Sequence, residues 1–283
     1  MSRLISFRRF DDGRDRWLVS DAAPAPALTG VINRYSWWSE TTQSFNTRRE
    51  LAATSGVFII NLGNVLEIVD ASGVLHHVRA GQGFMGGIAE TTSLSRSTGD
   101  MAGLQVRIPL LNMARLVRCP LSELANRVVM LDELVGAEAR TLGARLVEAR
   151  TSDKRWTVLD QFVLNRLADV DKGIGEAAHL VAWLRKGRSV QQIADDVGWS
   201  RKRVAQHFFA ATGLLPRAYS RLVRFERFTA LLQMQTVKSL AEAAAAAGYA
   251  DQPHLTREVG RFAGLTPRAL RARLIPEGGG VRE

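Results

Sequence analysis

The sequence has 283 residues, of which 46% are hydrophobic and 23% are charged; this length suits two domains, and the composition excludes wholesale disorder. Its single cysteine, Cys119, excludes an intramolecular disulfide and fits a reducing cytoplasm. The N-terminal residues lack the apolar core of a signal peptide and no apolar run reaches membrane-spanning length, so we expect a soluble, cytoplasmic protein.

The first 110 residues predict a β domain. Short runs rich in β-branched and aromatic residues alternate with turn signals such as Gly63-Asn64 and Gly81-Gln82-Gly83. The runs cover residues 31–38, 57–62, 65–69, 74–78 and 104–108. Regularly spaced short strands of this kind favour an antiparallel sandwich or barrel.

Helical patterns follow and accompany the β domain. They cover residues 110–117, 121–127, 137–149 and 156–167. In the third pattern, Leu142, Leu146 and Ala149 form a stripe that suits either a dimer seam or the core of the domain. Residues 169–175, rich in Gly and Asp, predict the boundary between an N-terminal domain of residues 1–172 and a C-terminal domain of residues 173–283.

The C-terminal domain is basic and contains an internal repeat. From residue 173 onward, 17 Lys and Arg stand against 9 Asp and Glu, which favours a polyanionic partner. Gly-Leu-X-Pro-Arg-Ala occurs at residues 213–218 and again at 264–269, and an earlier Ala-x-x-x-Gly also occurs twice, ending at Gly198 and Gly248. In each copy the glycine ends one helix in the left-handed conformation and a second helix follows, so each copy predicts a helix-turn-helix.

The second helix of each copy has one apolar and one basic face. Val204 and Phe208 anchor the first copy, and Leu255, Val259 and Phe262 anchor the second. The residues predicted to bind DNA are Arg201, Lys202, Arg203 and Gln206 in the first copy, and Gln252, Pro253, His254, Thr256, Arg257 and Arg261 in the second. Arginine and lysine neutralise phosphates and reach guanine edges, and glutamine pairs with adenine. Two amphipathic hairpins with merely solvated charges are the alternative, but the doubling favours DNA binding.

These residues resemble the AraC family of bacterial transcription regulators. Residues 248–258, Gly-Tyr-Ala-Asp-Gln-Pro-His-Leu-Thr-Arg-Glu, with Gly-Leu-Thr-Pro at 264–267, resemble its second helix-turn-helix, and residues 189–216 resemble its first. Residues 218–235 resemble its linking helix. The resemblance implies that two recognition helices enter successive major grooves of double-stranded DNA. It also implies that Ala205 and Pro253 face bases, to which they offer only shape and apolar contact.

The resemblance also implies the fold. An α+β chain is expected, with a cupin-like N-terminal β-sandwich or barrel and accessory helices, then an all-α domain of two helix-turn-helix motifs joined by a long helix. As one helix, residues 218–235 would span roughly 27 Å at about 1.5 Å per residue. With the flanking turns, this length could place the recognition helices near one DNA turn apart, about 34 Å.

Two features of the N-terminal domain invite a functional interpretation. The pair His76-His77 suggests a metal site, but adjacent strand residues point to opposite faces of a sheet. We therefore expect one histidine to face the core and the other to be exposed, with no metal bound. Tyr35, Trp37 and Trp38 either line a ligand pocket or fill the core. No nucleophile elbow or phosphate loop is present, so neither a catalytic residue nor a cofactor is expected.

The sequence therefore predicts a sequence-specific DNA-binding transcription regulator, such as an activator, controlled by a small-molecule effector. RNA polymerase is the expected partner, a homodimer is the expected assembly, and the bacterial nucleoid is the expected place of action. One alternative is a regulator whose N-terminal domain only makes protein contacts. The other is a metal-binding cupin enzyme fused to a DNA-binding domain.

Overall fold

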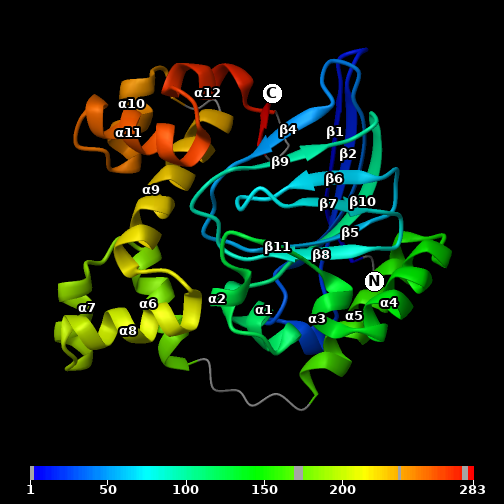
Figure 1. Ribbon diagram of the computed structural model, residues 1–283, viewed down its shortest axis with the longest axis horizontal. Coiled ribbons are helices and arrows are strands. Elements are labelled where there is room, and N and C mark those ends of the chain that lie inside the picture. Colours follow the sequence, from blue (N-terminus) through cyan, green and yellow to red (C-terminus); the bar gives the residue numbers. More distant parts are fainter. Residues whose placement is uncertain (1–2, 169–174, 235–236, 276–279) are drawn as a thin grey trace.

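The computed structural model describes residues 3–168, 175–234, 237–275 and 280–283. A two-sheet β domain comes first in the chain, and a helical domain lies beside it (Figure 1). This arrangement confirms the predicted α+β fold. The predicted boundary lies outside the described residues except for Gly175, which begins the first helix of the helical domain.

Two antiparallel sheets build the β domain. The seven-stranded sheet has, in spatial order, β1 (Leu4–Asp11), β2 (Arg16–Ala22), β3 (Arg34–Thr41), β10 (Asp100–Arg107), β5 (Val57–Asn61), β8 (Gly83–Gly86) and β11 (Val128–Met130). The five-stranded sheet has β12 (Val281–Arg282), β4 (Thr47–Glu50), β9 (Ser93–Arg96), β6 (Leu66–Val69) and β7 (Leu75–Val78). The strand β12 belongs to the far end of the helical domain in sequence but completes a sheet of the β domain.

Alternation along the strands gives the large sheet two different faces. On one face, Phe58 and Ile60 are buried in the main core, which the helices cover. On the other, Val57 and Ile59 line a cavity between the sheets. One sheet therefore supplies both a packed core and a hollow interior.

In the described part of the β domain, five α-helices and a short 3-10 helix (Pro26–Leu28) accompany the sheets, and the larger α-helices pack into the core of the domain. The five α-helices are α1 (Leu110–Val117), α2 (Leu121–Leu124), α3 (Leu131–Val135), α4 (Ala137–Glu148) and α5 (Ser152–Leu167). Leu142 and Leu146 of α4 are buried within the single chain, as is Ala149 just beyond the helix, and α4 packs on α5. The stripe that suited either a dimer seam or a core is therefore core.

The helical domain contains two helix-turn-helices at the two ends of one long helix (Figure 1). Its helices are α6 (Gly175–Arg185), α7 (Val190–Val197), α8 (Arg201–Thr212), α9 (Pro216–Gln233), α10 (Leu240–Ala247), α11 (Gln252–Ala263) and α12 (Pro267–Arg273). The linking helix α9 buries Phe225, Phe228 and Leu232. Among the described residues, no helix has the length and apolar character needed to span a bilayer.

Candidate nucleic-acid interface and effector cavity

The first helix-turn-helix, α7 and α8, is defined by its helix ends. Ser189 and Gln192 form a reciprocal capping box at the start of α7, and Gly198 ends that helix with φ 65°. Ser200 caps α8 by accepting from the Arg203 backbone N–H at 3.2 Å. Val204 and Phe208 are fully buried on one face of α8, and the opposite face is exposed.

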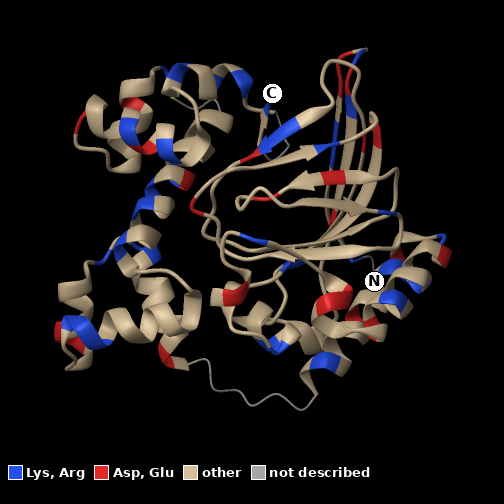
Figure 2. Cartoon of the chain, viewed as in Figure 1, with Lys and Arg blue, Asp and Glu red and all other residues tan. Residues whose placement is uncertain are grey.

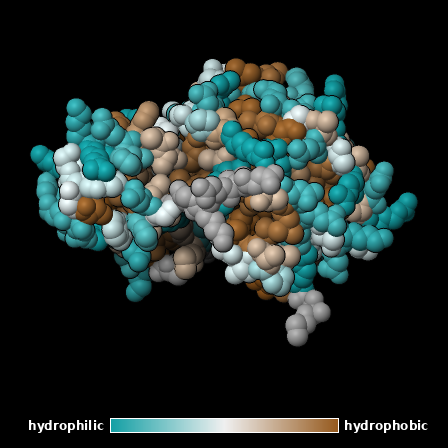
Figure 3. All heavy atoms as spheres, turned by 90° about the horizontal axis from the view of Figure 1, so that it is seen from below, coloured by the Kyte–Doolittle hydropathy of each residue, from teal (hydrophilic) through white to brown (hydrophobic). Residues whose placement is uncertain are grey.

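That opposite face carries the predicted donors. Arg201, Lys202, Arg203 and Gln206 are all exposed. The Arg203 guanidinium lies over the Trp199 ring, 4.4 Å from its centroid, a cation–π contact that orients it. Figure 2 shows Lys and Arg along this part of the chain, and in the view from below hydrophilic residues cover most of it, at the left of Figure 3.

The second helix-turn-helix, α10 and α11, repeats these ends. Ser239 caps α10, Gly248 ends it with φ 90°, and Asp251 caps α11 by accepting from the His254 N–H at 2.7 Å. The predicted residues of α11 that stand exposed are Gln252, Pro253, Thr256, Arg257 and Arg261. The two copies therefore present comparable polar surfaces.

Two of the predicted DNA-binding residues of α11 are engaged within the protein. His254 is half-buried, with its Nε2 3.3 Å from Glu258 Oε1 and its ring against Tyr249. Arg261 pairs with Glu90 of the β domain, with 3.2 Å between Nη2 and Oε1. The exposed polar surface of α11 thus rests on Gln252, Thr256 and Arg257.

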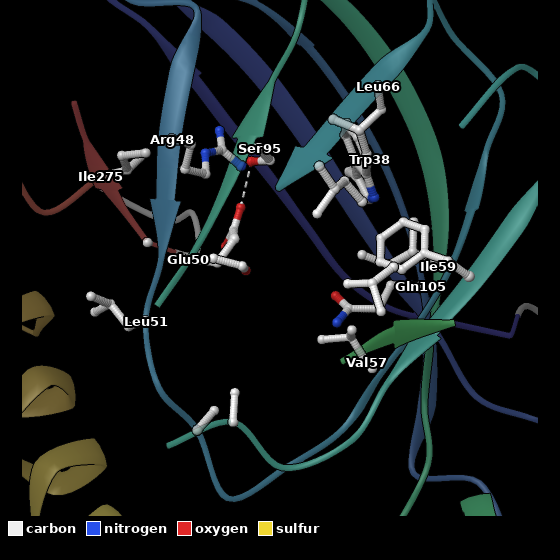
Figure 4. A pocket seen from close by; sticks show the side chains of 18 of the residues that line it. Trp38, Arg48, Glu50, Leu51, Val57, Ile59, Leu66, Ser95, Gln105 and Ile275 are labelled. Carbon is white, nitrogen blue, oxygen red and sulfur yellow. Dashed lines mark hydrogen bonds between the residues drawn. The ribbon is translucent and has the colours of Figure 1, made fainter. Parts of the chain in front are cut away.

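A cavity of about 450 Å³ lies between the two sheets. Figure 4 shows Trp38, Val57, Ile59, Leu66 and Gln105 on one side, facing Arg48, Glu50 and Ser95 across the hollow. Most of the first group is apolar and the second is polar. The cavity therefore suits a molecule with an apolar body and polar groups.

Of the three aromatic residues predicted to bind a ligand, only Trp38 lines this cavity. Tyr35 faces the helices instead, where its hydroxyl donates to Asp160 at 2.9 Å and its ring stacks on Trp156. Trp37 packs against the same core. Tyr35 and Trp37 do not line the cavity because they project on the helix-covered face of β3, whereas Trp38 projects on the cavity face.

Strand β4 supplies two charged groups to the cavity. Arg48 pairs with Glu40 at 2.8 Å, and Glu50 accepts a hydrogen bond from Ser95 Oγ at 2.8 Å. Burial raises the pKa of Glu50, although Arg48 opposes the effect. Burial lowers the pKa of Arg48, but the nearby Glu40 and Glu50 outweigh it and raise that pKa.

A second polar group comes from the large sheet. Arg8, Ser36, Gln105 and Arg107 line the cavity. Ser36 donates to the buried Asp21 at 2.6 Å, and Arg8 pairs with the same carboxylate at 3.2 Å. The Arg107 guanidinium makes no ion pair or hydrogen bond with any residue in the described ranges, and burial, then the neighbouring Arg34, lowers its pKa. Asp21 opposes this lowering, and the Arg107 side chain is exposed to solvent, so its guanidinium is accessible to an acidic group.

The cavity also reaches the helical domain. Glu226 and Thr229 of α9 line it, together with Ile275 and Gly280. Glu226 accepts from the Thr54 backbone N–H at 2.7 Å and from the Thr54 hydroxyl at 2.6 Å. A molecule in the cavity would therefore touch the helix that joins the two helix-turn-helices.

The adjacent histidines divide as predicted. His76 is half-buried 3.4 Å from Asp70, and His77 is exposed 3.4 Å from Glu67. Within the described part of the chain, no three His, Cys, Asp or Glu side chains stand together as a metal would require.

Burial raises the pKa of Asp70, but hydrogen bonds from Ser72 and the Val128 N–H outweigh it and lower that pKa to about 2.

Comparison with known proteins identifies the helical domain. Residues 193–273 match a family model described as a helix-turn-helix domain. These residues form an AraC-type helix-turn-helix domain. No curated protein matches the sequence at a significant level.

Solved structures extend the likeness to the fold of most of the chain. ToxT from Vibrio cholerae bound to (E)-4-(8-methylnaphthalen-1-yl)but-3-enoic acid aligns at 13% identity and TM-score 0.50, over 82% of this chain and 96% of that one. A second ToxT structure aligns at 11% identity and TM-score 0.49, over 83% of this chain and 97% of that one. The AraC-like transcriptional activator CuxR aligns at 15% identity and TM-score 0.26, over 81% of this chain and 80% of that one. The first likeness shows a common fold.

The sequence motifs led to the AraC-type domain but not to the cavity beside it. Arg48 and Glu50 belong to β4, whose sequence Thr-Arg-Arg-Glu has no hydrophobic alternation and gives no strand signal. Glu226 lies on a helix whose pattern was predicted, but its partner Thr54 is distant in sequence. Only tertiary pairing brings these residues together.

Proposed function

We propose that this protein is a sequence-specific transcription regulator that binds promoter DNA through both recognition helices and responds to a small acidic effector. One observation carries the proposal: α8 and α11 present equivalent polar faces at the two ends of α9, and α9 also lines the cavity. In this proposal RNA polymerase is the partner on the promoter. Occupancy of the cavity would shift how the two helices are presented to DNA.

The exposed side chains of α8 and α11 and the length of α9 support binding in the major groove of DNA. Lys202, Gln206, Gln252 and Arg257 are exposed, and Arg257 and the two glutamines suit guanine and adenine edges in the major groove. The 18 residues of α9 span roughly 27 Å at about 1.5 Å per residue. That length suits two recognition helices in successive grooves of one DNA face.

Selection of bound sequences from a random DNA pool tests the proposal. The full-length protein at near-physiological salt, with and without effector, should recover a motif with two half-sites one helical turn apart. Recovery of no motif under either condition would contradict sequence-specific regulation.

Substitution of Arg257 then tests base reading. Arg257→Ala should weaken binding to the selected site roughly 5- to 150-fold, the equivalent of about 1–3 kcal/mol for a base contact, and affect random DNA much less. Arg79→Ala, an exposed cation of the β domain, is the matched control and should change neither. Equal losses on both DNAs would remove Arg257 from the base-reading set.

The effector class follows from the cavity lining. Val57, Ile59, Leu66 and Trp38 would hold an apolar body, and Arg107 would take an acidic group. The acid named in the ToxT structure combines these two features, so it serves as a probe. Its primary amide keeps the shape and removes the charge.

Fluorescence of the tryptophans, Trp38 among them, reports occupancy of the cavity. Saturable binding of the acid is expected, with the amide weaker, and Arg107→Ala should weaken the acid about tenfold and spare the amide. Arg79→Ala should bind both as the wild type does. Absence of saturable binding would favour an N-terminal domain that only makes protein contacts.

A further inference from the structure

We infer that residues 280–283, here called the strap, hold the second helix-turn-helix against the β domain, and that strand β4 couples the strap to the cavity. This inference rests on the proposed function and adds its regulation. The strap and β4 lie side by side at the edge of the five-stranded sheet (Figure 1).

Backbone pairing attaches the strap at both of its sides. Val281 pairs with Arg49 and Arg282 with Arg48 in an antiparallel ladder, and the Glu283 N–H donates to the Thr47 carbonyl at 3.2 Å. Leu274, just after α12, bridges to Val281. The strap therefore joins the end of α12 to β4.

Side chains reinforce this attachment. Val281 is fully buried, and Arg49 pairs with Glu283. Arg282 lies 3.7 Å from the buried Asp15. Gly280 has φ 80°, and a Cβ there would overlap the Arg49 carbonyl, so the close approach of the two strands requires glycine. These contacts form a specific interface.

Arg49 also reaches the recognition helix itself. Its Nη1 donates to the Ala263 carbonyl, the last residue of α11, at 3.3 Å. Next to it, the Ala52 N–H donates to the Phe262 carbonyl at 3.3 Å. The end of α11 and the strap therefore share one support, the segment around β4.

The two faces of β4 make it a coupling element. Successive strand residues point to opposite faces, so Arg48 and Glu50 face the cavity while Arg49 faces α11 and the strap. Gly280 of the strap lines the cavity as well. A molecule bound to Arg48 or Glu50 therefore acts on the strand that also holds α11.

In the strapped state the recognition surface is incomplete. Arg261 lies on the exposed face of α11 but pairs with Glu90 of the β domain. Strap opening frees this cation for phosphate and lets α11 turn to fit its groove. The strapped form is thus the weak DNA-binding form, and cavity occupancy favours release.

Variants of the full-length protein test the strap in opposite directions. Glu283→Arg repels Arg49 and should raise affinity for the selected DNA site about tenfold, within the usual range of coupling between sites. Adding Arg49→Glu restores the pair with reversed charges and should return affinity toward wild type. Deletion of residues 280–283 should act like Glu283→Arg. Thermal melting checks that each variant is folded, and size-exclusion chromatography checks that the bared edge of β4 in the deletion variant has not caused aggregation.

A cross-link provides the reverse change. Thr47→Cys with Glu283→Cys, in a Cys119→Ser background, places two thiols on facing strand positions within disulfide range. The oxidised protein should bind DNA weakly and ignore the acid probe, and reduction should restore the response. Unchanged DNA affinity in the folded release variants, or a full response in the oxidised protein, would overturn the inference.

Amide hydrogen exchange separates this result from failure of the proposed function. If neither wild type nor variants bind any DNA site specifically, the proposed function fails. Faster exchange at the end of α11 in Glu283→Arg, reversed by Arg49→Glu, would still support the strap. Wild-type exchange at that position would overturn it.

Discussion

The two helix-turn-helices repeat each other in sequence but rest on the β domain in different ways. Gly213 and Gly264 end the two recognition helices in the left-handed conformation. A Cβ added at Gly213 would lie 2.9 Å from the Cα of Ser122 in α2, whereas one at Gly264 would meet the guanidinium of Arg49. Backbone atoms move little to relieve a close contact, whereas the end of a side chain moves easily. The first motif therefore packs against a rigid part of the β domain, here called the rigid seat, and the second packs against a side chain that can adjust.

The glycines themselves give the largest test of this difference. Gly213→Ala should lower the free energy of unfolding by about 3 kcal/mol, because left-handed strain of about 1 kcal/mol adds to a backbone clash. Gly264→Ala should cost less, about 1 kcal/mol of strain and about 1 kcal/mol for the lost hydrogen bond from Arg49 to the Ala263 carbonyl. Gly198→Ala has φ 65° and open space around it, so it is the control for strain. If urea denaturation shows that Gly213→Ala and Gly198→Ala lower the free energy of unfolding equally, the first motif has no rigid seat.

Asp70 holds the start of β11, the strand that follows α2 in the chain. This carboxylate accepts from the N–H of Val128, which begins β11 shortly after α2, and its pKa is lowered to about 2 from an ordinary 3.8. A depressed pKa adds stability above pH 3.8 that is lost as the pH falls toward 2. Asp70→Asn should therefore cost about 2 kcal/mol at pH 7, and the difference from wild type should vanish near pH 2. Denaturant titrations across this range measure it, and a cost independent of pH would assign Asp70 a purely steric role.

Buried charge distinguishes the second motif from the first. Glu258 of α11 is buried and lies 3.3 Å from both Arg224 and His254. Glu258→Gln leaves these groups without their counter-ion and should cost about 1.5 kcal/mol. At the corresponding place in α8, His207 is exposed, so His207→Gln should be nearly neutral. If denaturation shows that Glu258→Gln and His207→Gln lower the free energy of unfolding by similar amounts, buried charge does not distinguish the two motifs.

The smallest expected effect concerns the half-buried aromatic ring of the first motif. Trp199 holds Arg203 by a cation–π contact worth about 0.5–1 kcal/mol. Trp199→Leu should therefore weaken DNA binding about threefold through Arg203. In an Arg203→Ala background the same substitution should have no further effect, and an additive loss would mean that Trp199 acts independently.

The helical domain was largely readable in the sequence because local chemistry defines it. Gly198 and Gly248 end helices, and Ser189 and Ser200 begin them, whatever surrounds them. The apolar strands β5 and β10 could also be predicted from the sequence, because their own residues indicate a strand. The polar strand β4 could not, because only its pairing with β9 and β12 makes it a strand.

The candidate site was predicted in part. Exposed donors such as Lys202 and Arg257 follow from the amphipathic pattern of their helices. The pairing of Arg261 with Glu90 does not, since these residues are far apart in the chain. Trp37 and Trp38 could be assigned to opposite faces, but the pattern could not say which face is hollow.

The pairing of β12 with β4 has a consequence for folding and for dissection of the chain. A contact between residues 49 and 281 closes a very long loop, so it forms late and the edge of β4 stays open until then. An open strand edge is a template for pairing with another molecule. A fragment limited to residues 1–172 would keep that edge permanently bare, and we expect it to aggregate where the full-length protein does not.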